Sequence, residues 1–291
     1  MSPEPATAEV RRIPRPEPLA VPTHLPVRSD GKRLKQLSAS SIALFWRCPE
    51  RWRRRYLERE REPVAGPMLV GRAVGAAVTA HYAARIRGES LSAKDCDDLC
   101  VVEFDDGLLA PDLQLADDDP AELKANAREA LAAYLTEIAP GVEPAAVERK
   151  IETRFDGAEW SIVSYLDLED QEGIPIDLKV GAKHVTKPRA DKDAQASTYL
   201  LARAVEGRAA ERFDFHSVRR GAVKSGARCT VIDTTRTPGQ VAAFEHRLAL
   251  TARGIAHCDA TGDWPHSTPE GWWCSQSMCA FWASCEAGGA R

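Results

Sequence analysis

The chain has 291 residues, which is enough for one large domain or two small ones. Its hydrophobic content of 44% and charged content of 28% are those of an ordinary globular protein. The net charge of -4 gives no overall attraction to nucleic acid, so such binding must depend on local basic patches. No apolar run reaches the length of a membrane span, and the N-terminus lacks the apolar core of a signal peptide. We therefore expect a cytoplasmic protein with no membrane partner.

Residues 1–37 are rich in proline and basic residues, a composition that predicts a disordered or loosely docked arm. Ser38 to Ser41 can cap a first helix, which Cys48-Pro49 interrupts, and Pro49 suits the first turn of a second helix. That second helix carries a run of arginines, which form either a solvated face or a surface that contacts phosphates. The second interpretation makes candidate nucleic-acid-binding residues of Arg51, Arg54 and Arg55.

Residues 66–87 predict a helix whose many small residues allow close packing against a sheet. His81 on this helix is expected to be packed or exposed rather than to bind a metal. Residues 88–119 are acidic and predict loops, in which Cys96 and Cys100 are ordinary cysteines rather than metal ligands. Residues 120–138 have the period of an amphipathic helix.

Three strands follow, over residues 146–155, 160–168 and the stretch that ends at Lys179. Asp177 and Lys179 point to the same face of the last strand, roughly 7 Å apart. If the chain turns near Gln171-Glu172, Asp167 lies opposite Asp177. Opposed carboxylates destabilise a sheet, whereas a divalent cation between them removes that repulsion. Two carboxylates and a lysine around a hard cation are typical of metal-assisted phosphodiester hydrolysis. The alternative is a polar strand end with a surface ion pair.

The next region, residues 181–193, is a basic connector whose Lys183 and Lys187 are further candidates for nucleic-acid binding. A helix over residues 193–206 presents Gln195 and Tyr199 on one face, one turn apart. Two strands, at 213–218 and 228–232, precede a long helix at 238–259.

The C-terminal region contains Cys274, Cys279 and Cys285 among several tryptophans and a phenylalanine. This spacing suits a thiolate-ligated site shielded from water. The best candidate for a fourth ligand is Cys48, at the helix break, and the alternatives are Cys229 and Cys258. Zinc and a 4Fe–4S cluster both fit four thiolates, and the remaining alternative is a hydrophobic tail with three buried thiols.

The order of these motifs resembles that of the RecB-like nucleases of the PD-(D/E)XK superfamily. More narrowly, it is similar to the cluster-bearing branch that includes CRISPR-associated exonucleases and phage-encoded RecB-like exonucleases. The resemblance implies an α/β, restriction-endonuclease-like core, with a central mixed sheet flanked by helices, in a nuclease domain over residues 38–291. It also implies an iron–sulfur subdomain formed by residues 38–62 and 264–291, in which a 4Fe–4S cluster joins the two ends of the chain. The implied cluster ligands are Cys48, Cys274, Cys279 and Cys285.

The resemblance further implies the residues of a catalytic site. Asp167 and Asp177, with Glu148, correspond to the metal-binding carboxylates, and Lys179 to the family's lysine. Gln195 and Tyr199 match the Gln and Tyr of the following helix. The family usually has a metal-binding His in a Gly-x-x-x-His pattern, and here Gly75 stands where that His is expected after Gly71.

We therefore expect a Mg²⁺- or Mn²⁺-dependent DNA exonuclease with a preference for single strands. Its expected substrates are single-stranded DNA or duplex ends, in recombination, repair or the processing of mobile-element or phage DNA, and a helicase or recombinase is a candidate partner. Because Gly75 replaces a ligand, the alternative is a non-catalytic DNA-binding or assembly subunit that keeps the fold and the cluster.

Overall fold

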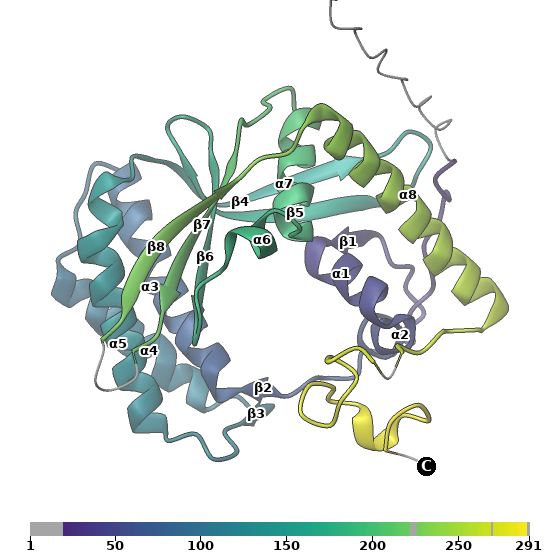
Figure 1. Ribbon diagram of the computed structural model, residues 1–291, viewed down its shortest axis with the longest axis horizontal. Coiled ribbons are helices and arrows are strands. Elements are labelled where there is room, and N and C mark those ends of the chain that lie inside the picture. Colours follow the sequence, from purple (N-terminus) through teal and green to yellow (C-terminus); the bar gives the residue numbers. More distant parts are fainter. Residues whose placement is uncertain (1–19, 222–225, 269, 290–291) are drawn as a thin grey trace, which may run out of the picture.

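The computed structural model describes residues 20–221, 226–268 and 270–289. Its centre is a mixed, six-stranded sheet surrounded by helices, which confirms the predicted α/β architecture (Figure 1). The strand order is β1-β5-β6-β7-β8, and β4 pairs with β5 as well. The strands are β1 (Gln36–Ser38), β4 (Pro144–Arg154), β5 (Ser161–Asp170), β6 (Pro175–Gly181), β7 (Phe213–Arg219) and β8 (Arg228–Thr234).

The two edges of β5 are paired differently. One edge pairs antiparallel with β4 over almost the whole length of β5. The opposite edge pairs with two strands: β1 runs parallel to residues 161–163, and β6 runs antiparallel to residues 168–169. Within the described chain, residues 164–167 therefore lie between two partner strands and have no strand beside them on this edge.

Three helices pack together against β5, β6 and β7 in the largest hydrophobic core. They are α3 (Gly66–Ile86), α4 (Ala93–Leu108) and α5 (Pro120–Glu137). The expectation of loops over residues 88–119 is wrong, because α4 occupies much of this segment. Ser92 caps α4, and Cys96, Cys100 and Phe104 recur every four residues as its buried stripe. The acidic residues that favoured a loop are mostly on the outer face of this helix.

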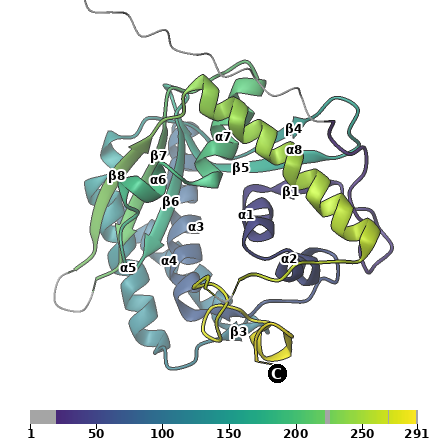
Figure 2. The ribbon, with the colours of Figure 1, turned by 45° about the vertical axis from the view of Figure 1, so that its right-hand side comes forward.

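The remaining helices pack around the other parts of the sheet. They are α1 (Ala39–Arg47), α2 (Pro49–Tyr56), the short α6 (Lys187–Ala190), α7 (Ala194–Val205) and α8 (Pro238–Thr261). After α8 the chain returns to α2, so that segments from opposite ends of the sequence lie side by side in both ribbon views (Figures 1 and 2). A two-stranded sheet of β2 (Val64–Ala65) and β3 (Leu113–Gln114) and the 3-10 turns η1 (Ala139–Gly141) and η2 (Trp282–Ser284) complete the described structure. No described helix is both long enough and apolar enough to cross a membrane.

The prediction of an N-terminal arm over residues 1–37 can be compared with the structure only from residue 20 onward. Residues 1–19 lie outside the described residues, but residues 20–37 pack against the domain. Leu25 is 1% exposed, the Trp160 indole donates to the Pro22 carbonyl at 2.8 Å, and the Glu159 amide donates to the Thr23 carbonyl at 2.9 Å. The prediction of a loosely docked arm up to residue 37 is therefore wrong for this part. Prolines lack an N–H donor, but the carbonyls of this segment accept hydrogen bonds and its few apolar side chains reach the core.

Candidate active site at the β5–β6 hairpin

The hairpin between β5 and β6 has the predicted register. Leu168 pairs with Ile176 and Glu169 with Pro175 around a turn in which Gly173 has a φ of 80°, a left-handed conformation that favours glycine. Asp167 and Asp177 are the next residues along the two strands, where the ladder opens. Asp167 Oδ2 accepts a hydrogen bond from the Leu178 amide at 3.2 Å, which holds the first carboxylate against the second strand.

Asp177 lies at the centre of a buried polar cluster. Its side chain is 2% exposed, and its Oδ2 lies 2.6 Å from Lys179 Nζ. The Gln195 amide nitrogen donates to Asp177 Oδ1, and Lys179 Nζ donates to Gln195 Oε1 at 3.0 Å. The strand and the following helix therefore bring together the three residues that the sequence analysis selected from two separate motifs.

Tyr199 links this cluster to the opening in the sheet. Its hydroxyl donates to the Tyr165 carbonyl at 2.5 Å and accepts from Gln195 Nε2 at 3.2 Å. Tyr165 belongs to the part of β5 that has no strand beside it on this edge, so the hydroxyl satisfies a carbonyl that the sheet leaves open. Asp193 fixes the start of α7 by accepting from the Gln195 and Ala196 amides. These contacts orient Gln195 toward Asp177.

The electrostatics of the site favour a bound cation. Burial and, in addition, the nearby carboxylate of Asp167 raise the pKa of Asp177 to about 7, despite the lowering effect of Lys179. Burial also raises the pKa of Asp167. Burial alone would lower the pKa of Lys179, but attraction to Asp177 raises it above its ordinary value. Oxygen donors of this kind suit Mg²⁺ or Mn²⁺, and a divalent cation would relieve the repulsion between the two carboxylates. Among the described residues, no three Asp, Glu, His or Cys side chains are gathered closely enough to form a metal site by themselves.

Glu148 lies on β4, between the pairs Val147–Leu168 and Arg149–Leu166, and thus beside Asp167 across the two strands. Its φ of 47° is unusual for a residue other than glycine, and backbone strain of this kind is frequent at functional sites. Glu148 and Asp167 line the same cavity of about 550 Å³. The structure therefore brings Glu148 to the other side of Asp167 from Asp177.

Gly75 of α3 lines this cavity as well. A Cβ atom added at Gly75 would meet no heavy atom within 4 Å, so the position has room for a larger side chain. His81 does not replace the expected ligand, because it is not among the residues that line the cavity, and its ring packs against Tyr82 with centroids 5.2 Å apart. Where the family pattern has a histidine, this protein therefore has open space, next to the candidate metal ligands Asp167 and Glu148.

A groove of about 1040 Å³ leads away from Lys179, Gln195 and Tyr199. Elements far apart in the sequence form its walls: α1, α2, α6, α8 and the C-terminal segment. The basic residues that line it are Lys179, Arg47, Arg51, Arg55, Arg189, Lys192 and Arg247, and the aromatic residues other than Tyr199 are Trp46, Tyr56, Tyr165, Trp272 and Trp273. Cationic and aromatic side chains in one groove are what single-stranded nucleic acids bind.

The predicted nucleic-acid-binding residues agree only in part with this groove. Arg51 and Arg55 line it, although both form ion pairs with Glu62 at 2.7 Å. Lys183 and Lys187 are exposed on the connector and do not line it. Arg189 and Lys192, which belong to the same predicted basic connector, do line the groove. The sequence analysis missed Arg47 and Arg247, because they come from separate helices and no local run of basic residues marked them.

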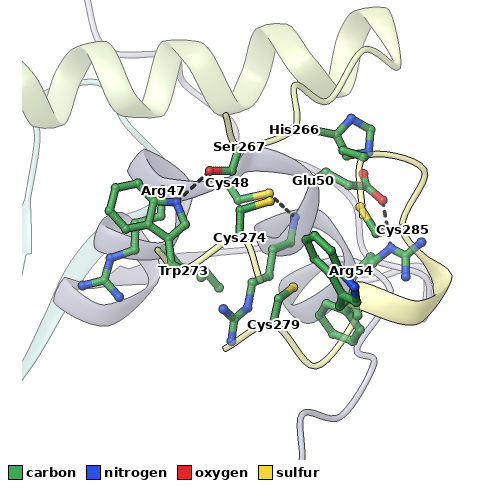
Figure 3. Close-up of a pocket in the computed structure, with 15 residues that line it drawn as sticks. Arg47, Cys48, Glu50, Arg54, His266, Ser267, Trp273, Cys274, Cys279 and Cys285 are labelled. Carbon is green, nitrogen blue, oxygen red and sulfur yellow. Dashed lines mark hydrogen bonds and ion pairs between the residues drawn. The ribbon is translucent and has the colours of Figure 1, made fainter. Parts of the chain in front are cut away.

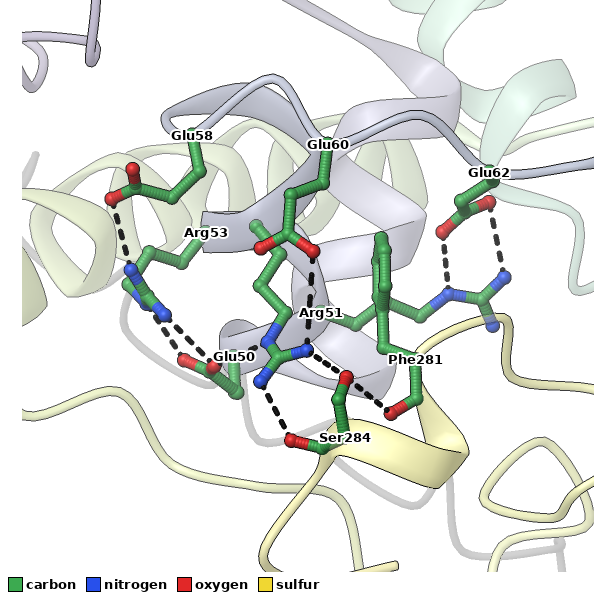
Figure 4. Close-up of polar contacts among 9 residues, drawn as sticks. Glu50, Arg51, Arg53, Glu58, Glu60, Glu62, Phe281 and Ser284 are labelled. Atoms are coloured by element: carbon green, nitrogen blue, oxygen red, sulfur yellow. Dashed lines mark hydrogen bonds and ion pairs between the residues drawn. The ribbon is translucent and has the colours of Figure 1, made fainter. Parts of the chain in front are cut away.

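Arg54 does not line the groove, and its contacts are within the protein. It forms an ion pair with Glu50 at 2.9 Å and donates to the Ser284 hydroxyl at 2.7 Å and the Ser284 carbonyl at 3.0 Å. Its guanidinium also lies over the Phe281 ring, 5.5 Å from the centroid. Figure 4 shows Ser284 and Phe281 against the arginines of α2. Arg54 therefore fastens the C-terminal segment to α2.

Four cysteines line a second cavity, between α2 and the C-terminal segment (Figure 3). They are Cys48, Cys274, Cys279 and Cys285. Cys48 is the N-cap of α2, where its sulfur accepts from the Arg51 amide at 3.4 Å. Burial raises the pKa of Cys48 and of Cys274, and the nearness of the other thiols adds to both shifts. The two alternative fourth ligands do not line this cavity: Cys229 is on β8 and Cys258 is on α8.

Comparison with known proteins agrees with this geometry. A family model described as the PD-(D/E)XK nuclease superfamily matches residues 36–286. No curated protein matches the chain. Among solved structures, a crystal structure described as a "Putative exonuclease" from Eubacterium rectale is 12% identical, covers 84% of this chain and 87% of its own, and has a TM-score of 0.55. At this identity the likeness concerns the fold alone. The crystal structure of SSO0001 is 13% identical, with 88% of each chain covered and a TM-score of 0.38, too low to support an argument.

Proposed function

The chain belongs to the PD-(D/E)XK nuclease superfamily, and on this premise we propose that it is a metal-dependent nuclease that hydrolyses phosphodiester bonds in DNA. One observation carries the proposal. Asp177, Lys179 and Gln195 form a hydrogen-bonded cluster beside Asp167, and Lys179 and Gln195 open onto a groove lined by basic and aromatic residues.

Mg²⁺ or Mn²⁺ held by Asp167 and Asp177, with Glu148 assisting directly or through water, would supply a nucleophilic hydroxide and neutralise the scissile phosphate. The residues of the chain then have separate tasks. Lys179 stabilises the negative charge that develops on the phosphate or orients the attacking water. Gln195 keeps the Asp177 carboxylate and the Lys179 ammonium in position, and Tyr199 keeps Gln195 in position.

We further propose that the enzyme is a RecB-like exonuclease with a preference for single-stranded DNA. The groove supports this preference, because aromatic side chains can stack on the bases of an unpaired strand while cations contact its phosphates. The proposed setting is recombination, repair or the processing of mobile-element or phage DNA, with a helicase or recombinase as partner.

The cysteine-lined cavity supports a 4Fe–4S cluster as a structural cofactor. Its donor set fits, because four thiolates are the usual ligands of such a cluster. A single zinc ion is the alternative, because it also takes four thiolates, gathered at about 2.3 Å from one point. The cluster would join residues 38–62 to the segment that begins at residue 264.

Gly75 favours one alternative, a non-catalytic DNA-binding or assembly subunit. The cavity beside Asp167 and Glu148 lacks the imidazole that accompanies exonuclease activity in the resembling family. Such a subunit would bind DNA in the groove and release no nucleotides with any metal.

The test is degradation of end-labelled single- and double-stranded DNA by anaerobically purified protein, with Mg²⁺, with Mn²⁺ and with EDTA, beside the Asp177→Ala variant. We expect metal-dependent cleavage that the variant abolishes while it still binds DNA. Equal cleavage by Asp177→Ala would exclude the assigned site, and DNA binding without cleavage would favour the alternative.

A further inference from the structure

The cations of the groove fall into two groups. Lys179 is paired with Asp177, and Arg51 and Arg55 share Glu62. The second group forms no ion pair with any carboxylate of the described residues. It consists of Arg47, Arg189, Lys192 and Arg247, all of them exposed. Exposed cations without acidic partners are free to neutralise the phosphates of a bound strand.

Arg247 differs from the others because it is also stacked. Its guanidinium lies over the Trp46 ring, with Cζ 3.7 Å from the centroid. The indole beneath it is fixed, because its N–H donates to Thr251 Oγ1 at 2.7 Å and its edge meets Phe244, with centroids 6.0 Å apart. Trp46 and Arg247 both line the groove that contains Lys179 and Gln195. A planar cation is thus held by a rigid aromatic ring in the wall of the groove.

We propose that Trp46 and Arg247 form a stacking platform for one base of the DNA strand, and that Arg47, Arg189 and Lys192 contact its phosphates. A guanidinium stacked on an indole presents a flat, weakly hydrated, positively charged surface, which suits the face of a nucleobase. The platform sets the position of the strand relative to Lys179 without contacting the scissile phosphate. This inference rests on the proposed function only in taking the groove as the DNA site.

The experiment measures binding of a fluorescein-labelled oligonucleotide in EDTA, so that cleavage plays no part. A set of strands carries one abasic site at successive positions, and each strand is titrated against the wild type and against Arg247→Ala. Arg253→Ala is the matched control, because Arg253 is an exposed arginine of the same helix that does not line the groove. Arg247→Lys keeps the charge and removes the planar surface.

For the wild type we expect one abasic position to weaken binding by about 5- to 100-fold, the range expected for one stacked base. In Arg247→Ala and Arg247→Lys this penalty should largely disappear, whereas Arg253→Ala should keep it. Arg247→Lys should also keep the salt dependence of binding that Arg247→Ala reduces.

Three outcomes would overturn the platform: no binding of DNA, an abasic penalty that is the same in Arg247→Ala as in the wild type, or a penalty that Arg247→Lys retains in full. The nuclease proposal is tested separately, by the cleavage experiment. DNA cleavage with an unchanged abasic penalty would remove the platform alone, whereas the expected penalty without cleavage would remove the nuclease and leave the platform.

Discussion

Gln195 contacts both charged members of the β5–β6 cluster: its amide nitrogen donates to Asp177, and its oxygen accepts from Lys179 at 3.0 Å. An amide can do this because it carries a donor and an acceptor on the same plane. Gln195 thereby holds the Asp177–Lys179 ion pair in one orientation. A variant of Gln195 can therefore test this orienting role without removing either charge.

Gln195→Ala should lower the cleavage rate by about 10- to 100-fold, the usual effect of removing a residue that orients a metal ligand. The fold should persist, because the side chain is only partly buried at the start of α7. Steady-state cleavage of single-stranded DNA and thermal unfolding would check both points. A loss of cleavage that parallels a loss of folded protein would contradict the orienting role.

Metal affinity should depend on pH through Asp177. Its pKa is raised to about 7 in the folded protein, so below this pH a cation must displace a proton from the site. Affinity for Mn²⁺ should then rise by about tenfold per pH unit up to pH 7 and level off above it. Calorimetric titration between pH 5.5 and 8 would measure this. Asp177→Asn, which carries no ionisable group, should bind weakly and lose this dependence.

The same pKa predicts the stability of the metal-free protein. Because the folded state holds its proton more tightly than the unfolded chain, Asp177 contributes stability below its ordinary pKa of 3.8 that is lost as pH rises through about 7. In EDTA, the free energy of unfolding of Asp177→Asn should therefore fall less over this window than that of the wild type. Denaturant titrations of the two proteins at matched pH give the comparison, and parallel curves would contradict the assignment.

Gly75→His should fit into the open cavity and tighten Mn²⁺ binding, because the imidazole would face the space that Asp167 and Glu148 line. Gly75→Ala is the control for the helix alone, and it should stabilise the protein by roughly 0.5–1 kcal/mol. Calorimetry and thermal unfolding separate the two effects. If alanine tightened Mn²⁺ binding as much as histidine, ligation by the imidazole would be refuted.

Cys48→Ala should remove the iron and acid-labile sulfide of anaerobically purified protein and lower its unfolding temperature. The reason is that Cys48 is the one cysteine of the cavity supplied by the N-terminal half of the chain. The control variant Cys229→Ala, whose substitution lies outside the cavity, should retain the iron and the sulfide. Metal analysis would also distinguish zinc from iron, and zinc without sulfide would reject the cluster.

Arg54→Ala should destabilise the protein by about 2 kcal/mol, the size of a lost charge-assisted hydrogen-bond contact. The loss should be concentrated in the C-terminal segment, because Arg54 holds Ser284 through two hydrogen bonds. Amide hydrogen exchange would show faster exchange around Ser284 than in the sheet. Uniform acceleration would point to a global effect instead.

The hairpin and its site were predictable because their determinants are local. Alternation along a strand places Asp177 with Lys179, and one turn fixes the partner Asp167. The groove was not predictable in this way. Arg47 and Arg247 are two hundred residues apart, and only the tertiary fold brings their helices together. The prediction of loops in place of α4 relied on the acidic composition of this segment. Counting helical spacing would have detected Cys96, Cys100 and Phe104, which recur every four residues and form the buried stripe of the helix.

The pairing of β1 with β5 has a consequence for the order in which the protein is assembled during synthesis. Gln36 pairs with Ser161, so β1 can join the sheet only after more than a hundred further residues have been synthesised. The loop with Trp272 and Trp273, part of the groove wall, emerges later still. A nascent chain can therefore already contain the acidic hairpin while the wall of the groove is unfinished. On the proposal that DNA binds in this groove, such late completion would keep an incomplete chain from engaging DNA.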